Sequence, residues 1–183
     1  MLIARKAAEL FYQHGVAEIS VEDILACSGA SRGTFYKYFA DKQDVVGAAL
    51  EYRDEEFRDF ISRMTPVADS AEHYLNALFA ALLTWQREQG AHGCLFQSAF
   101  SQYQQSSERI KAAAIAHKKA FTLDLEQKLT ASGVTQPNQA AVRVNLLIEG
   151  ALALGHFGEP ETCLHQARDA AVALVTRSRG NKA

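Results

Sequence analysis

The chain has 183 residues, 48% of them apolar and 22% charged, with a formal net charge of −2 at pH 7. This length allows a buried core in one or two small domains, and only 3 prolines interrupt the chain, which favours a mostly helical protein. The slightly acidic balance argues against a protein that coats nucleic acid without specificity. Neither a long apolar stretch nor a signal peptide is present, so we expect no membrane span and a cytoplasmic protein.

Apolar residues recur at helical spacing along the whole chain, which predicts nine helices and no strands. The expected ranges are 2–14, 21–28, 32–39, 42–63, 69–89, 94–104, 107–132, 138–157 and 160–178. Pro66, Gly90 and Gly158 fall between predicted helices, where residues that interrupt helices are expected. We place the boundary within or after the fourth helix, and we assign a small domain to residues 1–48 and a larger one to residues 49–183.

The segment 20–42 is the most informative part of the chain. Ser20 is a good N-cap, and Asp23 stands three residues later, as in a capping box at the start of the second helix. Gly29 tolerates the left-handed backbone that ends a helix. The segment therefore predicts two short helices joined by a tight turn.

The second of these short helices has an apolar back and a polar front. Ser31 caps it, and Phe35 and Phe39 lie at i and i+4, where we expect them to face inward. Asp41 can cap the next helix, which places Lys42 in the first turn of that helix. The residues left to face outward are Arg32, Thr34, Tyr36, Lys37 and Tyr38. A basic, aromatic and hydroxyl-bearing front suits the major groove of DNA.

These features, in this order, resemble the helix-turn-helix of the TetR family of bacterial transcriptional regulators, over about residues 3–50. The residues that carry the resemblance are Ala7, Ala8, Leu10, Phe11, Gly15, Val21, Asp23, Ile24, Ser31, Arg32, Gly33, Thr34, Phe35, Tyr36, Tyr38, Phe39 and Lys42. The resemblance implies an all-α protein. Residues 1–48 would be a three-helix DNA-binding domain, and residues 49–183 a helical ligand-binding and dimerisation domain.

The resemblance also implies that helix 32–39 lies in the major groove of a double-stranded operator. Tyr38 and Lys42 match phosphate-contacting positions, whereas Thr34, Lys37 and then Arg32 are the best candidates for base edges. The full set of predicted DNA-binding residues is Ser31, Arg32, Gly33, Thr34, Tyr36, Lys37, Tyr38 and Lys42. For the two tyrosines the alternative is a role in packing.

In the second domain, the helices 138–157 and 160–178 are rich in small residues, which let helices approach closely. The resemblance implies that these two C-terminal helices form a homodimer as a four-helix bundle; the alternative is that the same faces pack internally. It also implies a pocket for a small-molecule effector. The predicted ligand-binding residues are Trp85, Phe96, Phe100, Tyr103, His117, Phe121 and Glu149. Aromatic residues at helical spacing also occur as plain core, and this alternative stays open.

The three cysteines, Cys27, Cys94 and Cys163, form no metal motif and no even disulfide set. Gly93, Cys94 and Leu95 resemble a branch of the family in which some members sense electrophiles or oxidants, and a thiol near a helix N-terminus is more nucleophilic. The alternative for Cys94 is a small buried apolar residue. We expect Cys27 in the core and a structural role for Cys163.

The predicted function is a dimeric, ligand-responsive transcriptional regulator, a repressor that a small molecule releases from a palindromic operator. One alternative is a thiol-based electrophile or redox sensor acting through Cys94. Another is an interaction module of similar fold that does not bind DNA. An enzyme is not favoured, because no third group is placed to orient Cys94 with His92 or His117. The histidine spacings predict no metal site, and we expect no cofactor.

Overall fold

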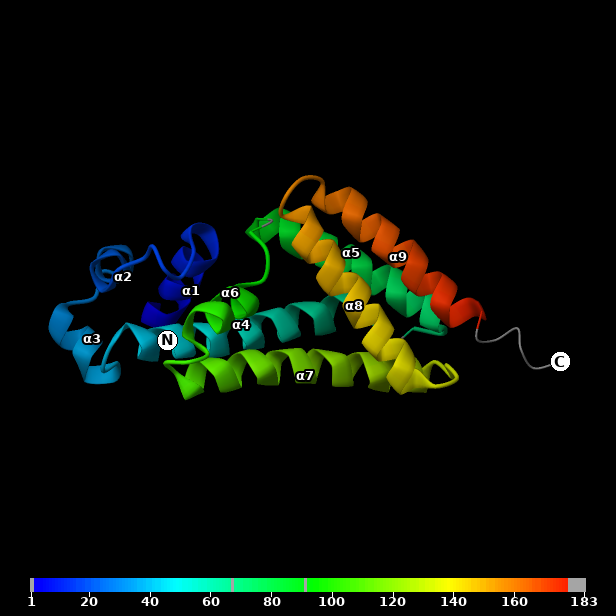
Figure 1. Cartoon of the computed structure of the whole chain (residues 1–183), viewed down its shortest axis with the longest axis horizontal. Helices are drawn as coiled ribbons and strands as arrows, with labels where there is room; N and C mark the ends of the chain where they lie inside the picture. Colours follow the sequence, from blue (N-terminus) through cyan, green and yellow to red (C-terminus); the bar gives the residue numbers. More distant parts are fainter. Residues whose placement is uncertain (1, 67, 91, 178–183) are drawn as a thin grey trace. The chain divides into compact units, whose positions relative to one another are not determined.

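The computed structural model describes residues 2–66, 68–90 and 92–177, and within them the chain forms helices and no strand (Figure 1). The all-α prediction is therefore confirmed. The helices are α1 (Leu2–His14), α2 (Val21–Ser28), α3 (Arg32–Tyr38), α4 (Lys42–Met64), α5 (Ala71–Gln89), α6 (Leu95–Tyr103), α7 (Glu108–Ala131), α8 (Pro137–Gly155) and α9 (Pro160–Arg177). In the described residues no helix is long and apolar enough to cross a membrane.

Local capping explains the bounds of α2 and α3. The Ser20 hydroxyl accepts from the backbone N–H of Asp23 at 3.1 Å, and the Asp23 carboxylate accepts from the N–H of Ser20 at 2.8 Å, which confirms the capping box. Gly29 ends α2 in the left-handed region, with φ 68°. Ser31 caps α3 by accepting from the N–H of Thr34 at 3.1 Å.

The last two helices meet at a tight connection. α8 ends at Gly155, two residues before the predicted end, because the N–H groups of Phe157 and Gly158 bond back to Leu154 and Gly155 as turns. A Cβ on Gly155 would lie 2.8 Å from Cα of Pro160, so the glycine permits the start of α9 to approach this closely.

The chain packs as two compact units. Unit 1 comprises the described residues of Met1–Arg58 and Cys94–Lys118, and unit 2 those of Asp59–Gly93 and Lys119–Ala183. The helices α4 and α7 contribute residues to both units. The functional division at residues 48 and 49 concerns roles rather than packing, and it stays a prediction.

Unit 1 has an aromatic and aliphatic core. Phe11, Ile24 and Phe35 are fully buried there, and Phe39 is also buried, so the inward assignment of Phe35 and Phe39 is confirmed. The expectation for Cys27 is wrong, because this residue is exposed. The short helix α2 buries only Ile24 completely, and Cys27 lies beyond that face.

Arg109 ties the start of α7 to α4 inside unit 1. Its Nε and Nη2 donate to the carboxylate of Glu51 at 3.0–3.1 Å, and its Nη1 donates to the carbonyl oxygen of Asp44 at 3.4 Å. A Cβ on Gly47 would lie 2.8 Å from Cδ of Arg109, so the arginine crosses α4 where no side chain obstructs it. The Asp44 carboxylate also accepts from the N–H of Ala40 at 2.9 Å, which fixes the connection between α3 and α4.

In unit 2, α9 packs against both α8 and α5. Arg87 on α5 donates to Glu161 on α9 at 2.8 Å, and Asn145 on α8 donates to the Thr122 hydroxyl on α7 at 2.9 Å. Leu75, Leu78, Ile148 and Leu164 are fully buried. These contacts leave Val142, Leu146 and Leu154 exposed on the outer surface of α8.

Candidate functional site

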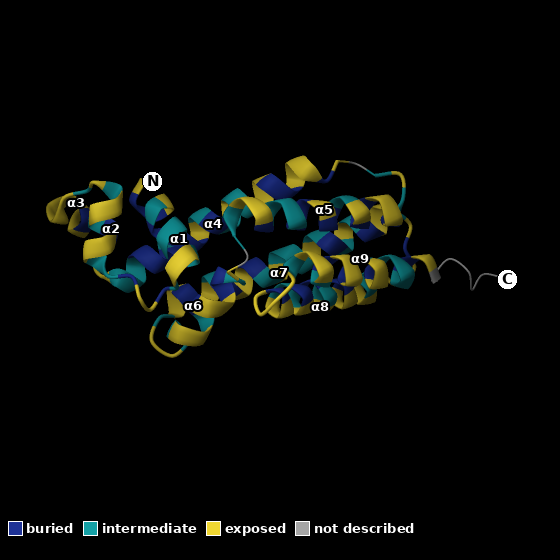
Figure 2. Cartoon of the chain, turned by 90° about the horizontal axis from the view of Figure 1, so that it is seen from above, coloured by how far each residue is buried: buried dark blue, intermediate teal, exposed yellow. Residues whose placement is uncertain are grey.

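The helix α3 is exposed over nearly all of its circumference (Figure 2). Phe35 is its one buried residue, whereas Tyr36 and Tyr38 are 54% and 55% exposed. Ser31, Arg32, Gly33, Thr34 and Lys37 are also exposed. A large aromatic side chain left in water is an unusual feature of a folded surface. All the predicted DNA-binding residues except Lys42 therefore lie on one short, solvent-facing helix or at its cap.

Hydrogen bonds fix part of this surface. The hydroxyls of Ser31 and Thr34 lie 2.9 Å apart, so the cap of α3 also orients Thr34. The Lys37 Nζ lies 5.6 Å from the ring centroid of Tyr38, within the range of a cation–π contact. Two phenol groups, two hydroxyls and one ammonium thus share a small area. Such groups can contact phosphates, sugars and base edges.

Lys42 occupies the first position of α4 and is half-buried. Its Nζ donates to the carbonyl oxygen of Ala17 at 3.1 Å, which holds the side chain toward the connection between α1 and α2. Burial lowers the pKa of Lys42, and the nearby carboxylates of Glu18 and Asp23 oppose that effect. Lys42 is also the first residue of α4, and the N-terminus of a helix favours a phosphate.

The sequence interpretation did not include Glu22 in this region. The Arg32 Nη2 donates to the Glu22 carboxylate at 2.7 Å and so joins the starts of α3 and α2. The two residues are ten positions apart. Their opposite charges are the only sequence signal for the pair, and such a signal is weak without the turn geometry.

The structure divides the predicted effector residues between the two units. Phe96, Phe100, Tyr103 and His117 belong to unit 1, and Trp85, Phe121 and Glu149 belong to unit 2. In unit 1, Phe96 is part of the core that includes residues of α1 to α4, and Phe100 and Tyr103 pack against that core. In unit 2, the three side chains are half-buried. Their role in ligand binding stays a prediction.

His117 is the centre of a buried polar cluster in unit 1. Its ring stacks on Phe96 with centroids 3.6 Å apart and an interplanar angle of 1°, and its Nδ1 lies 2.6 Å from the Asp54 carboxylate. Arg58 forms an ion pair with Asp54. Burial alone would raise the pKa of Asp54, but the hydrogen bonds from His117 and Arg58 outweigh it and hold the pKa below its ordinary value. Asp54 was not predicted, since no local pattern links α4 to α7.

Cys94 is half-buried and stands at the N-cap of α6. Its side chain makes no capping hydrogen bond, and the Nζ of Lys118 lies 3.3 Å from its sulfur. His92, which the sequence suggested as a neighbour for the thiol, is exposed. The structure therefore pairs the thiol with an ammonium that lies 24 residues away in the sequence.

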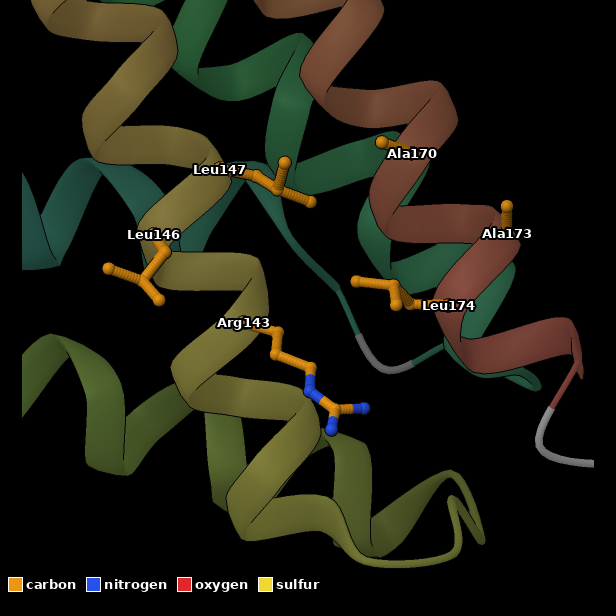
Figure 3. A pocket seen from close by; sticks show the side chains of 6 residues that line it. All are labelled: Arg143, Leu146, Leu147, Ala170, Ala173 and Leu174. Atoms are coloured by element: carbon orange, nitrogen blue, oxygen red, sulfur yellow. The ribbon is translucent and has the colours of Figure 1, made fainter.

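An open hollow of about 530 Å³ lies along α8 and α9 (Figure 3). Its lining is formed by Arg143, Leu146, Leu147, Ala170, Ala173 and Leu174. In Figure 3, Leu147 and Arg143 extend from α8 toward α9, whereas Leu146 points away from α9. Leu146 is 67% exposed. None of the predicted effector residues lines this hollow, and its apolar residues come from the two helices that were predicted to form the dimer.

Within the described part of the chain, no group of three or more histidine, cysteine or acidic side chains is placed to hold a metal ion. Several carboxylates of α4 are instead engaged in ion pairs. Glu51 binds Arg109, Asp54 contacts His117 and Arg58, and Glu56 accepts from a guanidinium of the same helix.

Comparison with known sequences identifies the N-terminal region. Residues 3–49 match the family of bacterial regulatory proteins, tetR family. A segment of 83 residues is 30% identical to MftR of Mycobacterium tuberculosis, whose assigned role is transcriptional regulation of mycofactocin biosynthesis. That segment spans 45% of this chain and 40% of the relative.

Comparison with solved structures extends the likeness to nearly the whole chain. A TetR-family transcriptional regulator from Streptomyces coelicolor superposes with a TM-score of 0.84 at 22% identity, covering 95% of this chain and 94% of that one. A regulatory protein TetR from Rhodobacter sphaeroides gives 0.80 at 20% identity, covering 93% and 95%. At these identities the superpositions establish the shared fold. Residues 3–49 thus match the helix-turn-helix DNA-binding region of the tetR family of bacterial regulatory proteins, and the chain as a whole has the fold of solved TetR-family regulators.

Proposed function

We propose that the protein is a homodimeric repressor that occupies a palindromic DNA operator and is released from it by a small molecule. The observation that carries the proposal is the exposed face of α3. Tyr36 and Tyr38 remain in water beside hydroxyl and basic groups, while Phe35 anchors the same helix in the core. This surface has the groups that bind duplex DNA.

In the proposed complex, α3 enters the major groove. Tyr38 and Lys42 bind phosphates and set the position of the helix on the duplex, whereas Thr34, Lys37 and Arg32 meet base edges. Two copies of α3, one from each subunit, would lie about 34–36 Å apart to reach successive major grooves. A palindromic operator follows from the two-fold symmetry of such a dimer.

The proposed dimer interface is the surface of α8 and α9 around the hollow. Its apolar lining and the exposed Leu146 support this choice, since contiguous exposed apolar surface marks interaction sites more often than scattered apolar residues do. In a two-fold dimer the same surface of both subunits would meet and form a four-helix bundle. Burial of this surface would then hold the two recognition helices at a defined spacing.

The proposed effector binds within residues 49–183 and changes the tilt of α4, which contributes residues to both compact units. A ligand shifts such an equilibrium only if it binds the two states with different affinity. A 100-fold ratio corresponds to about 2.7 kcal/mol. The aromatic residues available there suit a flat or hydrophobic molecule.

The first test is selection of binding sites from a random duplex library with the wild-type chain and the double variant Tyr38→Phe, Lys42→Ala. The expected result is a palindromic consensus that wild type enriches and the double variant loses. Its control is Tyr52→Phe, Lys119→Ala, which makes the same chemical changes on α4 and α7. If wild type enriches no sequence at low salt, the proposal is wrong, and a role as an interaction module without DNA binding is favoured.

A second candidate function is sensing of electrophiles or oxidants through Cys94. The contact between the Lys118 ammonium and the Cys94 sulfur is the observation that favours it. Alkylation of Cys94 would then release the DNA. The test compares Cys94→Ser with Cys27→Ser, which removes an exposed thiol elsewhere. If operator binding by Cys94→Ser responds to an electrophile as wild type does, the thiol is no sensor.

A further inference from the structure

An ion pair joins the two helices of the helix-turn-helix on their exposed side. Arg32 is the first residue of α3, and its Nη2 donates at 2.7 Å to Glu22, which lies in the first turn of α2. The two side chains are 66% and 60% exposed. Exposed ion pairs contribute little to folding stability, because water solvates and screens both charges. Stability of the fold therefore does not account for this arrangement.

Helix electrostatics also leave the position of Arg32 unexplained. The N-terminus of a helix carries a partial positive charge, so a cation in the first turn of α3 is unfavourable there. Glu22 compensates for that cation, although a carboxylate near the DNA-binding face repels phosphates. The pair therefore improves neither non-specific DNA binding nor the stability of α3. What the pair does provide is a direction: the hydrogen bond from Nη2 to Glu22 places the guanidinium of Arg32 beside the exposed face of α3.

We infer that Glu22 is a positioning residue that orients Arg32 to read a guanine in the major groove. The inference rests on the proposed function and adds a base specificity to it. In helix-turn-helix proteins the N-terminal residues of the recognition helix contact base edges. Arginine bound to O6 and N7 of guanine is the commonest specific contact. A guanidinium is a planar fork with five N–H donors, so one donor bound to Glu22 leaves others for the two acceptors of guanine.

The inference predicts opposite effects on specificity and on affinity. Without the Glu22 carboxylate, Arg32 can swing to a phosphate, a contact that carries no sequence information. Loss of a negative charge also favours binding to any duplex. Glu22→Gln should therefore reduce the preference for guanine while binding to random-sequence DNA stays equal or becomes tighter. A purely structural ion pair would leave the base preference unchanged.

The experiment uses the full chain and selection from a random duplex library, followed by fluorescence anisotropy with single-base variants of the consensus. The variants are Glu22→Gln, Arg32→Ala and the double variant. The control is Glu55→Gln, which removes one exposed carboxylate from α4. Wild type should prefer guanine at one symmetric position of each half-site by about tenfold, as a bidentate contact allows. The preference of Glu22→Gln for guanine at this position should fall to less than about threefold, whereas Glu55→Gln should keep the wild-type preference.

The double variant shows whether Glu22 acts through Arg32. At the guanine position it should behave as Arg32→Ala alone. An unchanged consensus for Glu22→Gln overturns the inference and leaves the proposed function standing. The inference is also wrong if Glu22→Gln alters base preference equally in the Arg32→Ala background, because the carboxylate would then act on the DNA directly. If wild type enriches no palindrome, the proposed function fails, and the inference fails with it.

Discussion

Replacing Leu146 with alanine should weaken self-association and leave the fold of each subunit intact. Leu146 is 67% exposed in one subunit, and alanine is the best helix former, so the change should cost the isolated subunit little. Complete burial of a leucine side chain stabilises by about 1.5–3 kcal/mol, so burial of the exposed two thirds contributes about 1–2 kcal/mol. An isologous dimer buries the residue twice, so the Leu146→Ala dimer should lose about 2–4 kcal/mol of association free energy. Its dissociation constant should therefore be about 30- to 700-fold higher than that of wild type.

Sedimentation equilibrium over a concentration series measures this dissociation constant directly. The matched control is Leu123→Ala, because Leu123 is 54% exposed on α7 and does not line the hollow. The dimer of Leu123→Ala should have the same dissociation constant as the wild-type dimer. The reasoning is refuted if Leu146→Ala dissociates as wild type does, or if both leucine variants weaken the dimer equally. Circular dichroism of both variants checks that each subunit keeps its helices.

Three further predictions concern stability. Phe35→Ala should lower the free energy of unfolding by about 3–5 kcal/mol, because it leaves a cavity in the core of unit 1; in urea denaturation, a loss below about 1 kcal/mol would contradict the importance of this anchor. Asp54→Ala removes the 2.6 Å partner of His117 and should lower the melting temperature at pH 7 by about 3–12 °C. Since the pKa of Asp54 is lowered in the folded state, this stabilisation is complete above about pH 4 and is lost as the pH falls through the folded pKa. A difference in melting temperature that grows on acidification would refute this assignment. Gly29→Ala should cost about 1–2 kcal/mol because its φ of 68° is left-handed, and an unchanged urea midpoint would contradict that cost.

The ordered contacts around Arg109 bear on how α4 is held in unit 1. One side chain binds Glu51, crosses Gly47 and reaches the carbonyl of Asp44, whose carboxylate fixes Ala40 before α4 begins. This chain of contacts leads from α7 to the connection that follows α3. A tilt of α4, as in the proposed response to the effector, would have to preserve or break these bonds as a group.

Much of the DNA-binding helix pair was determined by local sequence. Ser20, Gly29 and Ser31 set the bounds of α2 and α3 through hydrogen bonds or backbone angles that involve residues at most four positions away. The spacing of Phe35 and Phe39 placed both in the core. Such signals can be read directly, because helix capping and helical periodicity depend only on neighbours along the chain.

Only the tertiary structure decided which distant side chains meet. The pairing of His117 with Asp54 joins residues 63 positions apart, and that of Cys94 with Lys118 joins residues 24 apart. The resemblance suggested one effector pocket that includes Phe96, whereas the structure places Phe96 in the core of unit 1. Periodicity shows that a residue faces inward but not which helix covers it. The exposure of Cys27 was missed for the same reason, because the sequence does not show which face of α2 other helices cover. The sequence therefore determined the helices and the exposed face of α3, whereas packing between helices decided the buried clusters and the surface left open on α8 and α9.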